Sequence, residues 1–509
     1  MAISSQDGVA TRLIATTGIM LATTMNSLDS TIANVALPHI QGSLSASQDQ
    51  ITWVLTSYIV ATAIMTPLGG WLSLKIGRKP LFLISIVGFV AASVLCGMAA
   101  NLPEMVAFRL LQGFAGAAMM PISQAVVLDL WPQRLMPRVM AVWSAVIMVG
   151  PILGPTLGGF LTENFSWRWC FYINVPFGIL AFAMVYVALE ADSGGRERPF
   201  DFLGFAALVV ATGAIQLMAD RGSGQDWFES WEIWLYAILA IGSVYVFVIQ
   251  TLTADQPFFH RDLYTDRNFI TTSVFSFMMS AMLFGTSAIL PTFMQNLLGY
   301  TAYQSGLTSM YRGFGSICVF AVTPLMMRKL GPRPTMGLGV AVAFFSLWQM
   351  AHFDLMMTAR PIQLAGFIQG MGMGMMFGPL SVLGFATLNP AHRTEAAVLG
   401  TVIRTMGSSL GIALLQANLI SQTATAHERL AAGIVPSDPV IRWSLPHVFD
   451  GASGALEGLN GEVTRQGAMI GYDTVFAWMA LLSLVLVPLI LILRPASSSP
   501  TETIDVHPD

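Results

Sequence analysis

The sequence predicts an all-α polytopic membrane protein, and its composition and its long apolar runs support this class. The 509 residues are 54% hydrophobic and only 10% charged, with a mean hydropathy of +0.66. A soluble domain carries about 25% charged residues. Apolar runs recur along most of the chain and are joined by short polar segments. The molecular surface is therefore expected to face an apolar solvent, and a net charge of −4 gives no sign of a nucleic-acid partner.

Each apolar run is long enough to cross a bilayer, which takes about 20 residues. The first run lacks a small-residue cleavage site, so it is expected to remain as the first span. A polar linker is expected at 253–268 and a long polar loop at 420–471. The fourteen predicted spans are 13–34, 51–72, 80–99, 104–126, 138–161, 169–189, 202–219, 232–252, 269–290, 305–326, 335–352, 362–387, 397–419 and 472–493.

The basic residues predict the orientation of these spans. With the N terminus inside, the cytoplasmic segments hold 15 of the 24 Lys and Arg residues, whereas the short outside loops hold three. Basic residues favour the cytoplasmic side of a membrane. Both termini are therefore expected in the cytoplasm, and loop 420–471 is expected in the periplasm.

A weak internal repeat divides the chain. Gln112 and Gly113 in the fourth span match Gln369 and Gly370 in the twelfth, at similar depth. Parallel repeats of six spans are one plan by which large membrane proteins are built. The predicted domains are therefore a six-helix bundle at 1–190, two linker spans with a cytoplasmic linker at 191–268, and a second six-helix bundle at 269–509 that includes the long loop.

Two charged residues are predicted to meet inside the membrane, where each charge costs at least about 2.5 kcal/mol. Asp29 in the first span and Arg109 in the fourth both lie about five or six residues to the outer side of the span centre, which is about 8 Å. They are expected to interact directly or through water. A carboxylate balanced between desolvation and an arginine can take up a proton when its surroundings hydrate. A static structural ion pair is the alternative.

Other polar residues within spans have two interpretations each. Arg312 and Arg404 have glycines one turn away, which permit close helix packing. Capping of backbone carbonyls at a helix crossing is slightly favoured for both, and a gating or substrate-facing role is the alternative. Asn34, Gln112 and Gln369 are likewise expected either to contact substrate or to pack.

The fifth span is unusually rich in glycine and proline. Glycines that recur every four residues make one smooth helix face, and prolines remove backbone donors and bend the helix. A smooth bent face suits two halves that rock across each other, and simple tight packing is the alternative. The residues concerned are Gly150, Pro151, Gly154, Pro155, Gly158 and Gly159.

Signatures of other protein classes are missing from the sequence. It contains no G-x-x-x-x-G-K-[ST] phosphate loop, so ATP is not expected to supply energy here. It has no H-E-x-x-H and no G-x-S-x-G motif, and its seven histidines are scattered. The cysteines, Cys96, Cys170 and Cys318, lack metal-ligand spacing and are expected to be small buried hydrophobes. No metal, cofactor or enzymatic activity is expected.

Several motifs together resemble the major facilitator superfamily, in its fourteen-span drug:proton antiporter branch of the EmrB type. They are Leu28–Pro38 in the first span, Arg109–Gly113 in the fourth, Gly150–Gly159 in the fifth, and the cytoplasmic loop motif with Gly70, Gly77, Arg78 and Lys79. The resemblance covers nearly the whole chain. The family's loop motif carries an aspartate between Leu72 and Lys75, where this chain has Leu74. This departure puts the usual cytoplasmic lock in doubt.

The resemblance implies the major facilitator fold and export of drugs or other small amphipathic compounds by alternating access, driven by proton entry. It implies a bacterial inner-membrane location, with a periplasmic membrane-fusion adaptor and an outer-membrane channel as partners besides substrate, protons and lipid. Asp29 and Arg109 would couple protons, and Gly150–Gly159 would govern gating. A dedicated exporter of one endogenous metabolite or lipid shares every motif and stays open.

Overall fold

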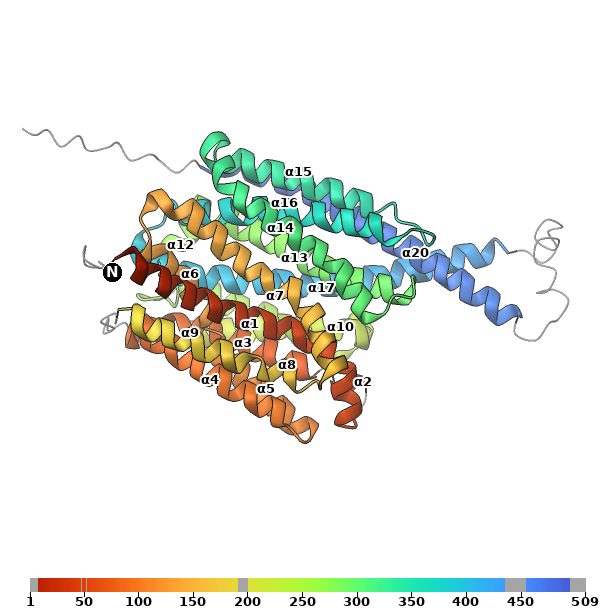
Figure 1. Ribbon diagram of the computed structural model, residues 1–509, viewed down its shortest axis with the longest axis horizontal. Coiled ribbons are helices and arrows are strands. Elements are labelled where there is room, and N and C mark those ends of the chain that lie inside the picture. Colours follow the sequence, from red (N-terminus) through yellow and green to blue (C-terminus); the bar gives the residue numbers. More distant parts are fainter. Residues whose placement is uncertain (1–7, 47, 52, 191–199, 435–454, 495–509) are drawn as a thin grey trace, which may run out of the picture.

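The computed structural model describes residues 8–46, 48–51, 53–190, 200–434 and 455–494, and every regular element within them is a helix. The long helices lie side by side along the longest axis of the molecule (Figure 1). The all-α class predicted from composition is therefore confirmed. Eleven helices in the described part of the chain are long and apolar enough to cross a membrane.

The N-terminal part of the chain forms one packed group of helices. α1 packs against α7 and α9, while α5 packs against α3 and α4. Gly77 turns the chain between α3 and α4 with a φ of 93°, a backbone conformation that glycine adopts readily. The helices are α1 (Val9–Ser43), α2 (Gln48–Ile51), α3 (Trp53–Ile76), α4 (Arg78–Met98), α5 (Leu102–Gly116), α6 (Met119–Leu130), η1 (Gln133–Leu135), α7 (Met136–Asn164), α8 (Trp169–Tyr172) and α9 (Asn174–Ala188).

The C-terminal part repeats this arrangement. α16 packs against α14 and α15, and α13 packs against α17. Gly331, with a φ of 89°, turns the chain between α14 and α15 as Gly77 does between α3 and α4. The helices are α13 (Arg267–Asn296), α14 (Ala302–Leu330), α15 (Pro332–Met350), α16 (Ala359–Phe385), η4 (Pro390–His392), α17 (Arg393–Ala432), α20 (Ala455–Leu484) and α21 (Leu486–Ile492).

Two helices stand between these groups in sequence, α10 (Phe202–Gly222) and α11 (Trp231–Thr253), and they pack against each other. α10 also contacts both α3 and α17, whereas most of the α11 surface is exposed. The short elements η2 (Ser223–Gln225), η3 (Trp227–Glu229) and α12 (Asp262–Thr265) lie in the connections on either side of α11. Of the two predicted linker spans, only the second is therefore peripheral to the packing.

The N-terminal and C-terminal helices meet along two seams. In the first seam α7 packs against α14 and α16. In the second seam α3 packs against α17, and a Cβ atom on Gly70 would lie 2.8 Å from Val398 Cγ2. α10 covers this second seam because it touches both of its helices.

The predicted count of fourteen spans stays a prediction. Three of the predicted spans, 13–34, 138–161 and 335–352, are helical within α1, α7 and α15 but do not belong to the eleven strongly apolar helices. The domain boundary near 190 falls next to residues 191–199, which lie outside the described residues. The division into domains therefore also stays a prediction.

The prediction of a long loop at 420–471 is wrong over most of its length. α17 continues to Ala432 and α20 begins at Ala455, and the two helices pack against each other. They project beyond the ends of the other helices (blue in Figure 1). The 40 residues of α17 span about 60 Å at 1.5 Å per residue, twice the thickness of the hydrocarbon core. Residues 435–454 of the predicted loop lie outside the described residues.

Candidate functional site

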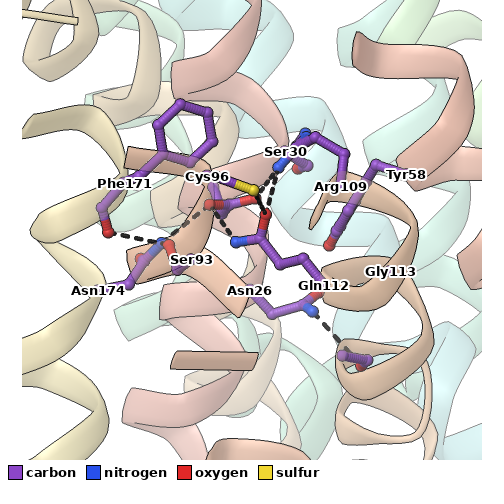
Figure 2. Close-up of polar contacts among 12 residues, drawn as sticks. Asn26, Ser30, Tyr58, Ser93, Cys96, Arg109, Gln112, Gly113, Phe171 and Asn174 are labelled. Carbon is purple, nitrogen blue, oxygen red and sulfur yellow. Dashed lines mark hydrogen bonds and ion pairs between the residues drawn. The ribbon is translucent and has the colours of Figure 1, made fainter. Parts of the chain in front are cut away.

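The predicted contact between Asp29 and Arg109 is confirmed as a buried ion pair. Arg109 Nη1 lies 2.7 Å from Asp29 Oδ2, and the two side chains are 0% and 1% exposed. α1 supplies the carboxylate and α5 supplies the guanidinium. Figure 2 shows how Arg109, Gln112 and Asn174 lie at this site, with their polar contacts dashed. Such a pair is costly to desolvate, so it persists only where further hydrogen bonds satisfy both groups.

Amide side chains satisfy the rest of the carboxylate. Gln112 Nε2 and Asn174 Nδ2 each donate to Asp29 Oδ1 at 2.8 Å. Asn174 also donates to Ser93 Oγ at 2.8 Å, so α9 and α4 join the network (Figure 2). Gln112 was predicted either to contact substrate or to pack, and here it binds the ion pair directly. Side chains of α5 and α9 therefore bind the carboxylate on α1, and Ser93 on α4 supports Asn174.

The guanidinium is held from other directions. Arg109 Nη1 donates to Gln112 Oε1 at 2.8 Å, and its Nε donates to the Val54 carbonyl at 3.1 Å. The guanidinium carbon lies 4.3 Å from the centre of the Tyr58 ring, a distance typical of cation–π contacts. Arg109 Nη2 has no hydrogen-bond partner in the described part of the chain.

The two charges of this network depend on each other. In a fully buried setting the carboxylate of Asp29 offsets the guanidinium of Arg109, and loss of either partner would leave a buried charge that is strongly destabilising. Only Asp29 and Glu395 are buried carboxylates in the described ranges, and Glu395 lies at the start of α17.

The glycine-rich face of α7 packs within the N-terminal group. Cβ atoms on Gly150 and Gly154 would lie 2.2 Å from Ser27 Oγ and 2.0 Å from Thr31 Oγ1, and Gly158 faces the Ile32 carbonyl. Thr31 Oγ1 donates to the Gly150 carbonyl at 2.9 Å. In this conformation Gly150, Gly154 and Gly158 pack tightly against α1, while α7 also packs against α14 across the halves. The role of this motif in rocking therefore stays a prediction.

The other residues of the fifth-span motif add less. Gly159 has room, since its nearest neighbour would be Val35 Cγ1 at 4.0 Å. Positions 151 and 155 lie in α7, but their proline side chains lie outside what the structure describes. The same holds for the Asn34 side chain, whose backbone lies in α1.

The cytoplasmic loop motif joins the two halves through charges. Arg78 Nη1 lies 2.6 Å from Asp129 Oδ2, and Arg78 Nη2 donates to Thr394 Oγ1 at 2.8 Å. Arg393 Nη1 lies 3.1 Å from Asp129 Oδ1. Asp129 at the end of α6 therefore bridges the first residue of α4 and the first residue of α17. Lys79 instead donates to the Tyr186 carbonyl at 2.8 Å, within the N-terminal group.

Leu74, where the resemblance leads one to expect aspartate, faces an apolar surface. It lines a small pocket with Trp71, Phe258 and Phe259, and Glu395 lies at its edge. The segment that carries these phenylalanines leads into α12. A leucine fits this apolar contact, and an aspartate there would have to be desolvated.

A histidine cluster lies close to this junction. The rings of His260 and His392 stack with centres 4.1 Å apart, and His260 Nδ1 lies 3.3 Å from Asp262 Oδ2. One donor atom from each of the three residues lies within 4.8 Å of the others, so the cluster could hold a divalent cation. No local sequence pattern predicts this cluster, because 132 positions separate the two histidines.

Arg312 and Arg404 differ in their surroundings. Arg404 lies near the sulfur of Met120 on α6 and 3.5 Å from Thr401 Oγ1, and it lines a cavity with Gln124 and Ser381. Arg312 is 8% exposed, and its Nη1 has no hydrogen-bond partner among the residues described. Neither arginine caps a backbone carbonyl through a hydrogen bond in the described ranges, so the favoured interpretation of both is wrong there. Gln369 donates to Thr286 Oγ1 at 3.1 Å, and its Oε1 is unpartnered in the same ranges.

Sequence reasoning missed three contributors to these sites: Tyr58, Asn174 and Asp129. Tyr58 and Asn174 are uncharged, so the cost of a buried charge did not single them out. Asp129 lies next to the last residue of α6, near the end of a predicted span, where an acidic residue needs no special reason. Its only sequence signal is that no other acidic residue lies between residues 105 and 162.

The helices, their apolar surfaces and the buried charged network define a class, the multi-pass helical membrane proteins. This chain belongs to the Major Facilitator Superfamily, whose sequence model matches residues 19–412. Membership of this family makes it a transporter.

Curated relatives span almost the whole chain. The fatty acid resistance protein FarB of Neisseria gonorrhoeae is 33% identical over 490 residues, covering 94% of this chain and 96% of its own. The multidrug export protein EmrB of Escherichia coli K12 is 32% identical over 491 residues, covering 95% of each. The EmrB of Haemophilus influenzae is 34% identical over 475 residues, covering 92% of each.

A solved structure supports the fold alone. It is a bacterial homologue of the human lysosomal transporter Spinster, in an inward-facing and unoccupied conformation. The two share 16% identity and a TM-score of 0.56, covering 97% of this chain and all of that one.

Proposed function

We propose that the protein is a proton-coupled antiporter that exports drugs or other small amphipathic compounds across the bacterial inner membrane. Fourteen spans, with both termini in the cytoplasm, form bundles at 1–190 and 269–509 that rock about a central path. Residues 191–268 link the bundles. The relatives named for multidrug export support the substrate class.

The buried network around Asp29 is the observation that carries this proposal. Asp29 is a carboxylate sealed from water, matched to one arginine and held by two amides. Protonation from the periplasm would unbalance the pair, and release of the proton to the cytoplasm would restore it. Coupling of this kind needs one titratable group that both conformations can reach in turn, and Asp29 is the buried carboxylate within the N-terminal bundle.

The test is proton release from acidified everted vesicles. Addition of a substrate such as ethidium to wild-type vesicles should dissipate the pH gradient, because each exported molecule exchanges for protons. Asp29→Asn should reach the membrane but lose this response, since asparagine has the shape of aspartate and keeps one acceptor oxygen but lacks the titratable group. Asp255→Asn, at an exposed position of the cytoplasmic linker, is the matched control and should behave as wild type. A wild-type response in Asp29→Asn would exclude Asp29 as the coupling group.

A dedicated exporter of one endogenous metabolite or lipid is the second candidate. The relative named for fatty acid resistance favours it, because that name points to a narrow group of lipid-like substrates. A deletion strain should then become sensitive to one chemical class alone. Sensitivity to several unrelated amphipathic compounds would favour the multidrug function.

A periplasmic adaptor and an outer-membrane channel are further proposed partners, as the family resemblance implies. The projecting ends of α17 and α20 would offer a rigid surface outside the bilayer for the adaptor. Co-expression with a membrane-fusion adaptor encoded nearby should yield a complex that survives purification in mild detergent. Full resistance conferred by the protein alone in an adaptor-null strain would contradict the proposed tripartite assembly.

A further inference from the structure

The two halves carry the same helix crossing with different residues. In the N-terminal half, a Cβ atom on Gly113 would lie 2.5 Å from the Tyr58 carbonyl oxygen, and Thr62 Oγ1 donates to the Tyr58 and Gly113 carbonyls. In the C-terminal half, a Cβ atom on Gly370 would lie 1.8 Å from the Arg312 carbonyl oxygen. Ser316 Oγ lies within hydrogen-bond distance of the Arg312 and Gly370 carbonyls. Arg312 on α14 therefore occupies the place of Tyr58 on α3.

The neighbours of this crossing also correspond. Gln112 donates to Asp29, and Gln369, one residue before the matching glycine, donates to Thr286. Thr286 on α13 thus occupies the place of the Asp29 carboxylate on α1. Three residues before each glutamine stand Arg109 in one half and Gly366 in the other. A Cβ atom on Gly366 would lie 3.7 Å from the Arg312 backbone nitrogen, so the Arg312 backbone passes alongside this glycine.

The comparison shows what the C-terminal half lacks. In the N-terminal half the arginine belongs to α5 and the ring of Tyr58 on α3 lies against it. In the C-terminal half the arginine belongs to α14 and the position on α16 is glycine. The guanidinium is kept, but the carboxylate is replaced by a hydroxyl. Arg312 is 92% buried without a carboxylate partner, and its Nη1 donates to nothing in the described residues.

An unpaired buried guanidinium is costly, and no carboxylate in the described residues offsets this cost for Arg312. Arg404, the other arginine of the C-terminal spans, lies against a methionine sulfur and a hydroxyl and also has no carboxylate within ion-pair distance in the described ranges. Two guanidinium groups of the C-terminal half therefore carry positive charge that no neighbouring carboxylate balances in those ranges. α14 also forms the seam with α7, so Arg312 lies on a helix that borders the junction of the two halves.

We propose, resting on the export function above, that Arg312 binds the anionic headgroup of the transported molecule. The substrates are then organic monoanions, such as a carboxylate on an apolar body. In this assignment the headgroup supplies the negative charge that Asp29 supplies in the other half, where Gln112 and Asp29 correspond to Gln369 and Thr286. A planar guanidinium suits this task because it binds a carboxylate through two parallel hydrogen bonds.

Binding to the purified protein in nanodiscs at neutral pH tests the proposal without a proton gradient. Three probes share one apolar chain: dodecanoate, dodecan-1-ol and dodecyltrimethylammonium. Wild type should bind dodecanoate most tightly. Arg312→Gln should weaken the binding of dodecanoate about 10- to 100-fold, the range expected for the loss of a hydrogen bond to a charged group. Binding of dodecan-1-ol should not change, because it does not use the charge.

The matched control is Lys329→Gln, which removes one positive charge from the exposed cytoplasmic end of the same helix. It should leave all three affinities unchanged. Thr286→Asp is the second variant, since it restores the carboxylate that the N-terminal half has. In a protein that keeps Arg312, Thr286→Asp should abolish the preference for dodecanoate. In combination with Arg312→Gln it should cause no further loss of dodecanoate affinity.

Thermal stability separates a binding role from a structural one. Because Arg312 lacks a partner, Arg312→Gln should unfold at the same temperature as wild type or higher, with dodecanoate no longer stabilising it. A large loss of stability, or equal weakening of dodecanoate and dodecan-1-ol, would overturn the proposal. If dodecanoate affinity is unchanged in Arg312→Gln while Asp29→Asn still abolishes proton exchange, only the headgroup assignment fails. If wild type exchanges protons for no amphipathic compound, the export function itself fails.

Discussion

Asp129 accepts from two arginines that come from opposite halves of the molecule. Its side chain is 16% exposed, and Arg78 and Arg393 are similarly shielded. Partial burial reduces screening by salt, so this bridge is stronger than an exposed ion pair of about 0–1 kcal/mol. The ends of the two halves that are predicted to face the cytoplasm are thus joined by an ionic contact that needs no acid at position 74.

Neutralising this bridge should loosen the cytoplasmic side. In Asp129→Asn the two arginines would face each other without an anion, and like charges repel. A cysteine placed at Thr394, which accepts from Arg78, should then react several-fold faster with a thiol reagent from the cytoplasmic side. The measurement uses a background free of native cysteines, and Asp255→Asn serves as the control. An unchanged labelling rate would show that the bridge does not hold the two ends together.

The ion pair at Asp29 was predictable because charge in hydrocarbon is rare and depth can be counted along a helix. Asn174 and Tyr58 were not, since a neutral polar residue in a span has many ordinary explanations. The isolation of Arg312 was not predictable either. A sequence shows which residues are charged, but the lack of a carboxylate within reach is a property of the packed helices.

The α1–α7 contact depends on three glycines that leave no space for a side chain. Gly154→Ala places its Cβ atom against Thr31 Oγ1, and overpacking of this kind costs about 1–3 kcal/mol. We expect a lower melting temperature in detergent and slower efflux, because α1 also carries Asp29. Gly213→Ala on α10 is the matched control, since a Cβ atom there meets nothing within 4 Å. Equal stability of both variants would show that α1 and α7 separate freely.

The α17–α20 projection gives a direct test of topology. Ala424 on α17 is exposed beyond the predicted span, and it should lie outside the cytoplasmic membrane. Ala424→Cys should react with an impermeant thiol reagent in intact spheroplasts. Lys329→Cys, at the cytoplasmic end of α14, should react only after lysis. The reverse pattern would invert the orientation, and protection of both would contradict the three spans predicted between Lys329 and Ala424.

The error at 420–471 has a physical cause. Apolar periodicity marks a helix only where one face is buried against protein or lipid. In the projecting part, α17 and α20 pack against each other, and much of the sequence there is polar or small, which resembles a loop. Sequence reasoning therefore located the end of the apolar region correctly and misjudged the structure that follows it.

The repeat was the most useful sequence signal for the whole molecule. The matching Gln-Gly pairs do occupy equivalent crossings, and Gly77 and Gly331 turn the chain at equivalent places. Contacts between distant segments, such as His260 with His392, had no such signal. They depend on how the segment before α12 folds back over the start of α17, which no local pattern encodes.

The linker helices should not select substrates. Thr212 and Gln216 on α10 are buried, and the Thr212 hydroxyl bonds to the Leu208 carbonyl of its own helix. Replacing either with leucine should leave the range of exported compounds and the efflux rate nearly unchanged. Transport assays with several dyes would check this. A shifted substrate range would contradict this prediction. It would place α10 at the transport path, next to α3 and α17, which it contacts.

Because α10 covers the α3–α17 seam, the two seams between the halves differ in how they face the surrounding lipid. An amphipathic molecule dissolved in the bilayer that drifts toward the α3–α17 seam meets α10 first. On the opposite flank, α14 presents the apolar side chains of Tyr311, Phe314 and Ile317 at its surface. If the transporter takes its substrate from the membrane rather than from water, the substrate would therefore enter past α14 and not past α10.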